Sequence, residues 1–290
     1  LAPSEMCIRD RTYPVRYAAL LSCLPSNALH AGMIAMTDTT SAGLDALENI
    51  ALIIFDCDGV LIDSEPIASR TLAEMLRNAG MSITDEEAHV RFTGHSEPAI
   101  RRICAEELGM VDVDVHFSAW HTRLYEEFGR SLTSMPGIDA VVKSVKRPKC
   151  VASNSSIERL KSSLGKLDLW QHFHPAVFSA QMVARPKPAP DLLLHCAEQF
   201  HVKPEHCVMI DDSSHGVVAA NAADMTAIGF VDPADPRPDR ASLLKASGAA
   251  FVVNGAAELP AAITAANILI GEHDRPTDHS VTFAKPHQQL

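Results

Sequence analysis

The stretch that decides the fold reads Ile50-Ala51-Leu52-Ile53-Ile54-Phe55-Asp56-Cys57-Asp58-Gly59. Its first part is a continuous apolar run, which is typical of a parallel β-strand that is covered on both faces. The run ends abruptly in two aspartates and a glycine that permits a tight turn. This arrangement predicts a buried strand over 50–55 that brings Asp56 and Asp58 to the carboxyl end of a parallel sheet.

Further short apolar runs follow this strand, and helical patterns separate them. Apolar residues recur at helical spacing over 138–145 and 193–200, and Pro148 ends the first of these helices. Alternating strands and helices indicate an α/β fold with an open, doubly wound parallel sheet. The other predicted strands are 150–152, 176–178, 208–210, 227–230 and 251–253.

Between the first two predicted strands the alternation stops, because residues 66–135 contain helical patterns only. Apolar stripes begin near Ala68, Ile100 and Phe117, and a single crossover rarely needs about 70 residues. We therefore predict a helical cap domain over 66–135. It is inserted into a core domain made of 49–65 and 136–270.

The two ends of the chain do not fit the alternating pattern. We interpret residues 1–48 as an N-terminal extension that is not native to the protein or is disordered. Within it, 16–31 loosely resembles a secretory signal, but its apolar run is short and is interrupted by Pro25. The tail over 271–290 is polar, and we predict that it is disordered.

Composition narrows the classes of function. The 290 residues carry a formal net charge of −11 and contain no block of Lys and Arg, which argues against a nucleic-acid partner. No apolar stretch approaches the ~20 residues of a membrane span. Seven scattered cysteines without a Cys-x-x-Cys pair are typical of reduced, buried thiols. We predict a cytoplasmic monomer without nucleic-acid or membrane partners.

Polar residues follow four of the predicted strands, and the carboxyl ends of parallel strands meet at one edge of the sheet. Several carboxylates near one point suit Mg²⁺, and a lysine and a hydroxyl can complete the coordination of a phosphate. An aspartate that attacks a phosphate ester needs a cation beside it, and a second carboxylate can move the proton. The pattern favours phosphoryl transfer, although Ser153 and Asn154 could also cap the next helix. The residues are Asp56, Asp58, Ser153, Asn154, Lys187, Asp211 and Asp212.

Four segments resemble, in order, the motifs of haloacid-dehalogenase-superfamily phosphatases, and the resemblance extends over roughly 50–255. It is closest to the β-phosphoglucomutase-like subgroup, which includes bacterial 6-phosphogluconate phosphatases. The resemblance implies the family's core fold with a helical cap. It also implies a Mg²⁺-dependent phosphatase that acts on a small phosphorylated metabolite, such as a sugar phosphate or 6-phosphogluconate, through an aspartyl-phosphate. The segments are DCDGVLIDSE (56–65), VASNS (151–155), KPAPD (187–191) and IDDSSHG (210–216).

The resemblance implies a role for each motif residue. Asp56 would be the nucleophile, and Asp58 the general acid and base whose backbone carbonyl also binds the metal. Lys187 would neutralise the nucleophile and the phosphate. Ser153 and the backbone amide of Asn154 would hold a phosphoryl oxygen. The implied magnesium ligands are Asp56, Asp58, Asp212 and, directly or through water, Asp211.

One segment of the predicted cap resembles the family's substrate-reading loop, Phe92-Thr93-Gly94-His95-Ser96. We predict that Thr93, Gly94 and His95 contact the substrate. Gly94 would permit a close approach, and His95 would hydrogen-bond a sugar hydroxyl. Related proteins often carry lysine where Thr93 stands, so the loop does not single out a particular sugar phosphate.

Three other functions are possible on this fold. A phosphomutase fits the sequence as well as a phosphatase does, and the other two fit it less well. A phosphomutase would use the same core residues while shielding its aspartyl-phosphate from water, and the sequence does not separate it from a phosphatase. A haloacid dehalogenase needs no metal and normally lacks an acid at the position of Asp58. A non-catalytic regulator that binds a phosphorylated ligand would have lost the nucleophile or the acid. Both are present, so the main alternative is a phosphomutase.

Overall fold

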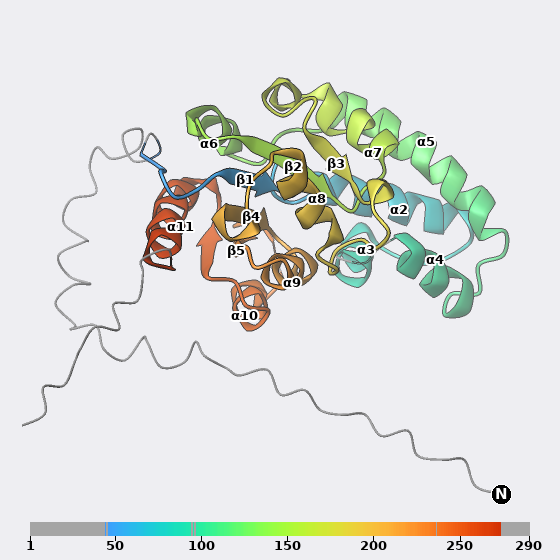
Figure 1. Ribbon diagram of the computed structural model, residues 1–290. Helices are drawn as coiled ribbons and strands as arrows, with labels where there is room; N and C mark the ends of the chain where they lie inside the picture. The colour runs from blue at the N-terminus through green and yellow to red at the C-terminus, as the bar shows by residue number, and fades with distance from the viewer. Residues whose placement is uncertain (1–43, 45, 94, 96, 236, 274–290) are drawn as a thin grey trace, which may run out of the picture. The chain divides into compact units, whose positions relative to one another are not determined.

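The computed structural model describes residue 44 and residues 46–93, 95, 97–235 and 237–273. The described strands form a six-stranded parallel sheet in the order β3-β2-β1-β4-β5-β6 (Figure 1). Each predicted strand is present, so the predicted doubly wound α/β class is confirmed. The strands are β1 (Leu52–Phe55), β2 (Lys149–Ser153), β3 (Val177–Ser179), β4 (Cys207–Asp211), β5 (Thr226–Val231) and β6 (Phe251–Asn254).

The strand order reverses at β1, which lies between β2 and β4. Phe55 is in register with Val151 of β2 and with Ile210 of β4. The next residue, Asp56, donates its backbone N–H to the Ile210 carbonyl at 2.9 Å. The carboxyl ends of three neighbouring strands therefore meet at the point where ligands bind in open α/β sheets.

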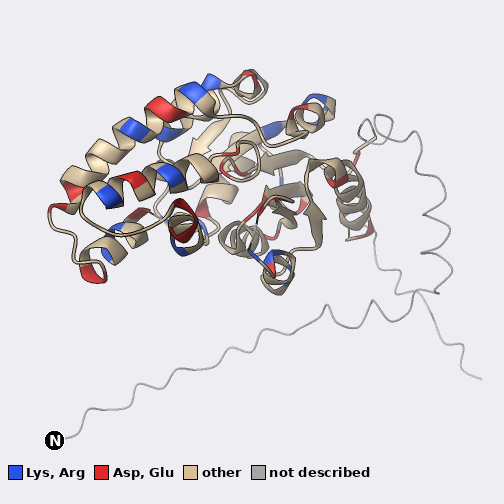
Figure 2. Cartoon of the chain, turned by 180° about the vertical axis from the view of Figure 1, so that it is seen from behind, with Lys and Arg blue, Asp and Glu red and all other residues tan. Residues whose placement is uncertain are grey.

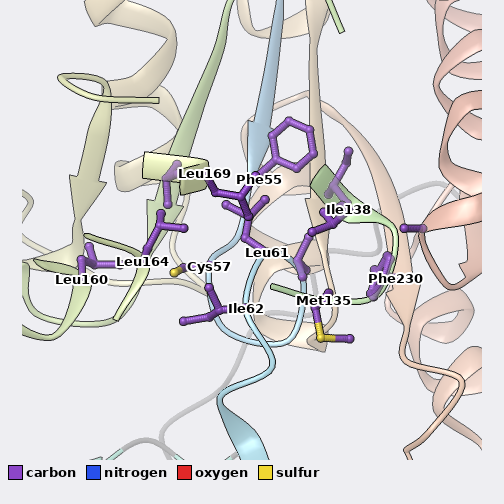
Figure 3. Packing of buried hydrophobic residues seen from close by; sticks show 14 of the residues in the cluster. Phe55, Cys57, Leu61, Ile62, Met135, Ile138, Leu160, Leu164, Leu169 and Phe230 are labelled. Atoms are coloured by element: carbon purple, nitrogen blue, oxygen red, sulfur yellow. The ribbon is translucent and has the colours of Figure 1, made fainter. Parts of the chain in front are cut away.

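The sheet is covered on both faces, because successive strand residues point to opposite sides. Ile53 and Phe55 belong to one buried cluster, and Leu52 and Ile54 belong to another. Figure 3 shows the first cluster around Phe55, with Leu61, Leu164 and other labelled side chains packed together. The first cluster includes α6 (Ile138–Ser144), α7 (Ile157–Ser162) and α11 (Leu259–His273), and the second includes α8 (Asp191–Gln199), α9 (Ser214–Ala222) and α10 (Arg240–Ala246).

Short 3-10 helices complete this part of the chain. They are single short turns next to the longer elements, as is usual for this helix type. They are η1 (Leu164–Lys166), η2 (Asp168–His172), η3 (Ala180–Met182), η4 (Pro204–His206) and η5 (Ala256–Glu258).

Helices alone fill the chain between β1 and β2 up to Ser131, as far as the described residues show. Three of them match the predicted apolar stripes, whereas α3 (Asp85–Phe92) was not predicted individually. Its sequence is polar, and a capping box between Thr84 and Glu87 begins it. Figure 2 shows Lys and Arg interspersed with Asp and Glu along these helices, without a continuous basic face in this view. The other three helices are α2 (Glu65–Asn78), α4 (Glu97–Glu106) and α5 (Val113–Ser131).

The predicted limits of the ordered core were too narrow at both ends. Leu44 and Leu47 are buried in the first cluster. Asn49 is hydrogen-bonded to Asn267 of α11 through its backbone N–H and its side chain, both at 2.9 Å. At the other end, α11 continues to His273, so residues 271–273 are helical. Residues 1–43, 45 and 274–290 of the predicted extension and tail lie outside the described residues.

No helix in the described ranges combines the length and the apolar character that crossing a membrane requires. The cytoplasmic location and the monomeric state stay predictions.

Candidate active site

Lys187 lies at the centre of the residues that follow the strands. Its Nζ donates to Asp56 Oδ1 at 2.9 Å, to Asp211 Oδ2 at 2.7 Å and to the Ala152 carbonyl at 3.0 Å. These three acceptors use all three donors of the ammonium group. Lys187 is only 5% exposed. The structure thus brings together the ends of β1, β2 and β4 with the loop that follows β3.

Three carboxylates crowd around this single lysine. One oxygen from each of Asp56, Asp211 and Asp212 lies within 4.8 Å of the others. Burial raises the pKa of Asp56 to about 7, and Asp211 adds to the rise, although Lys187 opposes it. Burial, Asp211 and Glu65 likewise hold the pKa of Asp212 well above its ordinary value. When all three are ionised, they have more negative charge than one lysine offsets, as expected for the hard-oxygen ligands of a divalent cation.

The two neighbouring aspartates of the fourth motif have different surroundings. Asp211 is 1% exposed, and its Oδ1 accepts from the backbone N–H and the hydroxyl of Ser213, both at 2.8 Å. With Lys187 on Oδ2, both oxygens of Asp211 are engaged within the protein. Asp212 lies beside Arg240, which donates to its backbone carbonyl and lies 3.3 Å from its Oδ2. Asp211 anchors the loop, whereas Asp212 faces a cavity.

Two glycines let the backbone approach these aspartates. Gly59 has a φ of +77°, and a Cβ there would lie 2.8 Å from Asp212 Oδ2. A Cβ on Gly216 would overlap Asp211 Oδ2, at 1.7 Å. Any other residue at either position would displace a carboxylate of the trio. The Gly216 constraint was not anticipated, although the residue belongs to a quoted motif.

Asp58 lies outside the trio and has its own partners. Its oxygens accept from Ser64 at 2.5 Å, from Ser155 at 2.8 Å and from Arg159 at 2.9 Å. Burial alone would raise the pKa of Asp58, but the Arg159 charge and these hydrogen bonds outweigh it, so the pKa lies below its ordinary value. Arg159 also lies over the ring of Phe128 in α5, 5.3 Å from the ring centre. It therefore links Asp58 to the helical insertion.

The role of Arg159 gave no signal in the sequence. It lies on α7 between apolar residues that mark the buried face, where a charged residue is ordinarily solvated. Only the fold reveals that its side chain turns toward the end of β1.

Ser153 and Asn154 hold the neighbouring loop in place. Ser153 is 2% exposed, and its hydroxyl accepts from the Ser155 backbone N–H at 3.1 Å. The Asn154 side chain donates to the Lys187 carbonyl at 2.9 Å and accepts from the Lys187 N–H at 3.0 Å. Neither residue caps the next helix, because Ser156 is the N-cap of α7. The Asn154 side chain positions the lysine loop.

A cavity of about 410 Å³ lies between the start of α2, α3 and the loop after β5. Gly59 and Asp212 line it, so it reaches the carboxylate trio. Ser69 and His89 line it from the helical insertion. It is the space beside the trio in which the rest of a substrate would fit.

The predicted substrate-reading loop contributes less to this cavity than expected. Thr93 lies behind the lining, with its hydroxyl 3.2 Å from His89 Nδ1 and 3.5 Å from Ser69 Oγ. His95 is exposed and does not line the cavity. Gly94 lies outside the described residues. Ser69 and His89 take the positions predicted for the loop, and no motif or periodicity singled them out.

Comparison with known proteins agrees with this geometry. Residues 53–230 match the haloacid dehalogenase-like hydrolase family over more than half of the chain. The chain belongs to this family. The resemblance in the sequence motifs is thereby confirmed, and the chain is a hydrolase.

Two proteins similar to this chain are phosphatases. The 6-phosphogluconate phosphatase of Escherichia coli is 32% identical over 194 residues, covering 66% of this chain and 86% of the relative. The fructose-1-phosphate phosphatase of the same organism is 35% identical over 188 residues, covering 62% and 96%. The crystal structure of a haloacid dehalogenase-like protein of unknown function from Agrobacterium tumefaciens is 36% identical, with a TM-score of 0.67, covering 74% and 98%. Family and relatives together support a phosphoric monoester hydrolase.

Proposed function

We propose that this protein is a magnesium-dependent phosphatase that forms an aspartyl-phosphate on Asp56. Its substrate is a small phosphorylated metabolite, either a sugar phosphate or a sugar-acid phosphate such as 6-phosphogluconate. The observation that carries the proposal is the buried contact of Lys187 with Asp56, 2.9 Å from Nζ to Oδ1, next to two further aspartates. This contact gives a carboxylate nucleophile the cation that it needs beside a phosphate.

In the first step, an oxygen of Asp56 attacks phosphorus and the bond to the leaving oxygen breaks. Lys187 stays against Oδ1 and offsets the negative charge of the carboxylate and the phosphoryl group. The Ser153 hydroxyl and the Asn154 backbone amide hold phosphoryl oxygens, in keeping with their place at the end of β2. Asp58 gives its proton to the leaving oxygen.

In the second step, Asp58 takes a proton from water, which attacks phosphorus and releases inorganic phosphate from Asp56. In the structure Asp58 is bound to Arg159, Ser64 and Ser155, which lowers its pKa. We propose that the bound substrate draws Asp58 away from these partners. The negative charge of the phosphoryl group then raises the pKa of Asp58 toward the range of a general acid.

The residues present fit a magnesium ion. Asp56, Asp212 and the Asp58 backbone carbonyl would hold it, with Asp211 close enough to act through water. All of these donors are oxygens, and the raised pKa values of Asp56 and Asp212 mark the negative charge that a cation would offset. A bound ion supplies positive charge next to the transferring phosphoryl group.

Removal of divalent metal tests the proposal. We expect EDTA followed by dialysis to lower phosphate release from a panel of sugar phosphates by about 10²-fold or more, because the carboxylates then repel the phosphate. Excess Mg²⁺ should restore the rate, and sodium chloride of equal ionic strength should not. Hydrolysis that is indifferent to chelator would contradict the metal assignment.

The same assay distinguishes a phosphatase from a phosphomutase. With β-glucose 1-phosphate, the proposed phosphatase releases inorganic phosphate. Steady formation of glucose 6-phosphate without phosphate release would contradict it.

A further inference from the structure

The cavity beside Asp212 has an unbalanced charge. Two guanidinium groups line it, those of Arg70 and Arg240. Arg237 stands behind the lining and pairs with Asp235 and Glu65. Arg77 pairs with Asp85 in the same way, at 2.9 Å. Even with Arg77 and Arg237 counted, the carboxylates outnumber the guanidinium groups by six to four. The lining carboxylates are Asp63, Glu65, Asp85, Asp212, Asp232 and Asp235.

The guanidinium groups are already engaged. Arg240 lies 3.3 Å from both Asp212 and Asp235, and Arg70 pairs with Glu127 at 2.9 Å. Asp63 and Asp232, in contrast, form no ion pair with any residue that the structure describes. Arg70 is half exposed and shares Glu127 with Arg123 and Arg130, so it is the one cation in the described lining that is not fully offset. Next to Asp63 and Asp232, an anionic group on the substrate would meet like charges, which would repel it.

The cations at the other end of the site change this balance only at Asp212, whose charge the proposed metal would offset. Lys187 is buried and saturated by its three acceptors, and the proposed metal lies where the phosphoryl group binds. The charge on the cavity walls therefore acts on the leaving group, which is the part of the substrate that separates from the phosphoryl group.

The same walls suit hydroxyl groups. Carboxylate oxygens accept hydrogen bonds from hydroxyls, and each carboxylate can accept several. Asp232 accepts one bond from the Ala234 N–H at 2.9 Å and retains further acceptor sites. Elsewhere in the lining, Ser69 Oγ lies 3.0 Å from His89 Nδ1, and the Ser69 hydroxyl can donate as well as accept.

We propose, building on the phosphatase function proposed above, that the leaving part of the substrate is an uncharged polyhydroxyl group. The protein therefore prefers neutral sugar or polyol phosphates over sugar-acid phosphates. This preference differs from that implied by the name of the 6-phosphogluconate phosphatase relative.

A matched pair of substrates tests the preference. Sorbitol 6-phosphate and 6-phosphogluconate share a six-carbon chain and differ at C1, where one has a hydroxymethyl group and the other a carboxylate. With Mg²⁺ present, we expect kcat/KM to favour sorbitol 6-phosphate by about tenfold or more. Equal or better use of 6-phosphogluconate would overturn the inference and leave the phosphatase function standing. Release of phosphate from neither compound, nor from p-nitrophenyl phosphate, would overturn both.

Variants that remove a carboxylate charge from the cavity wall test whether these charges cause the preference. Asp232→Asn keeps an oxygen for the Ala234 N–H while removing one negative charge from the wall. We expect Asp232→Asn to lower the ratio of kcat/KM for sorbitol 6-phosphate to kcat/KM for 6-phosphogluconate severalfold, mainly by raising kcat/KM for 6-phosphogluconate. Asp63→Asn should change this ratio in the same direction. The matched control is Asp239→Asn, because Asp239 is exposed, outside the cavity lining and at a positive φ that asparagine adopts readily. An unchanged preference in both wall variants, or an equal shift in the control, would overturn the inference.

Discussion

Replacing Asp56 with asparagine is expected to lower phosphate release by about 10⁴-fold or more, which is the scale of losing a covalent nucleophile. The amide keeps the size of the side chain and can still accept from Lys187, but it cannot form the aspartyl-phosphate. The measurement is kcat with the best substrate at saturating Mg²⁺. Rates within tenfold of the unaltered protein would contradict the nucleophile assignment.

Thermal unfolding serves as the control for this variant. The folded-state pKa of Asp56 is raised to about 7 from an ordinary 3.8, so the folded state binds this proton more tightly than the unfolded state does. The ionised carboxylate therefore destabilises the fold increasingly as pH rises from about 4 to about 7. Asparagine cannot ionise. Without metal at pH 7.5, Asp56→Asn should melt at the same temperature as the unaltered protein or higher, which excludes misfolding as the cause of inactivity.

Removal of Lys187 is expected to have the second largest effect. Lys187→Ala should lower kcat by about 10²-fold or more, as for the loss of one preorganised electrostatic partner. It should also destabilise the fold by about 3–5 kcal/mol, because Asp56 and Asp211 lose the buried cation that they share. Denaturant unfolding and steady-state kinetics measure the two effects. If the alanine variant does not fold, Lys187→Met replaces it in both measurements, because methionine retains most of the apolar stem of lysine.

A matched control for Lys187 is Lys203→Ala. The Lys203 side chain is 72% exposed and pairs only with Glu205 in the described part of the chain. Its removal should change neither kcat nor stability measurably. A loss of activity in Lys203→Ala comparable to that in Lys187→Ala would show that the buried position of Lys187 is not what matters.

The sheet could be predicted from the sequence because its central strands are buried on both faces. A strand such as β1 must be apolar at every position, and its abrupt end in Asp56 marks the edge of the sheet. The convergence of Asp56 and Asp211 follows from parallel topology alone, since it depends on where strands end and not on side-chain detail. Lys187 reaches them from the loop after β3.

The parts that could not be predicted depend on contacts between elements. α3 buries only Ala88 and Phe92, so it has no apolar stripe to detect. Arg159 reaches Asp58 across 101 positions of sequence, and no local pattern records that contact. Ser69 and His89 enter the cavity because α2 packs against α3, a pairing that the sequence pattern did not specify.

Chemical trapping tests the central claim most directly. During turnover with Mg²⁺ and the best substrate, acid quench followed by borohydride reduction converts an aspartyl-phosphate into homoserine, which peptide mass spectrometry can locate. The account predicts homoserine at position 56 and its absence from Asp56→Asn. Homoserine at position 58, 211 or 212, or its absence from a fully active enzyme, would contradict it.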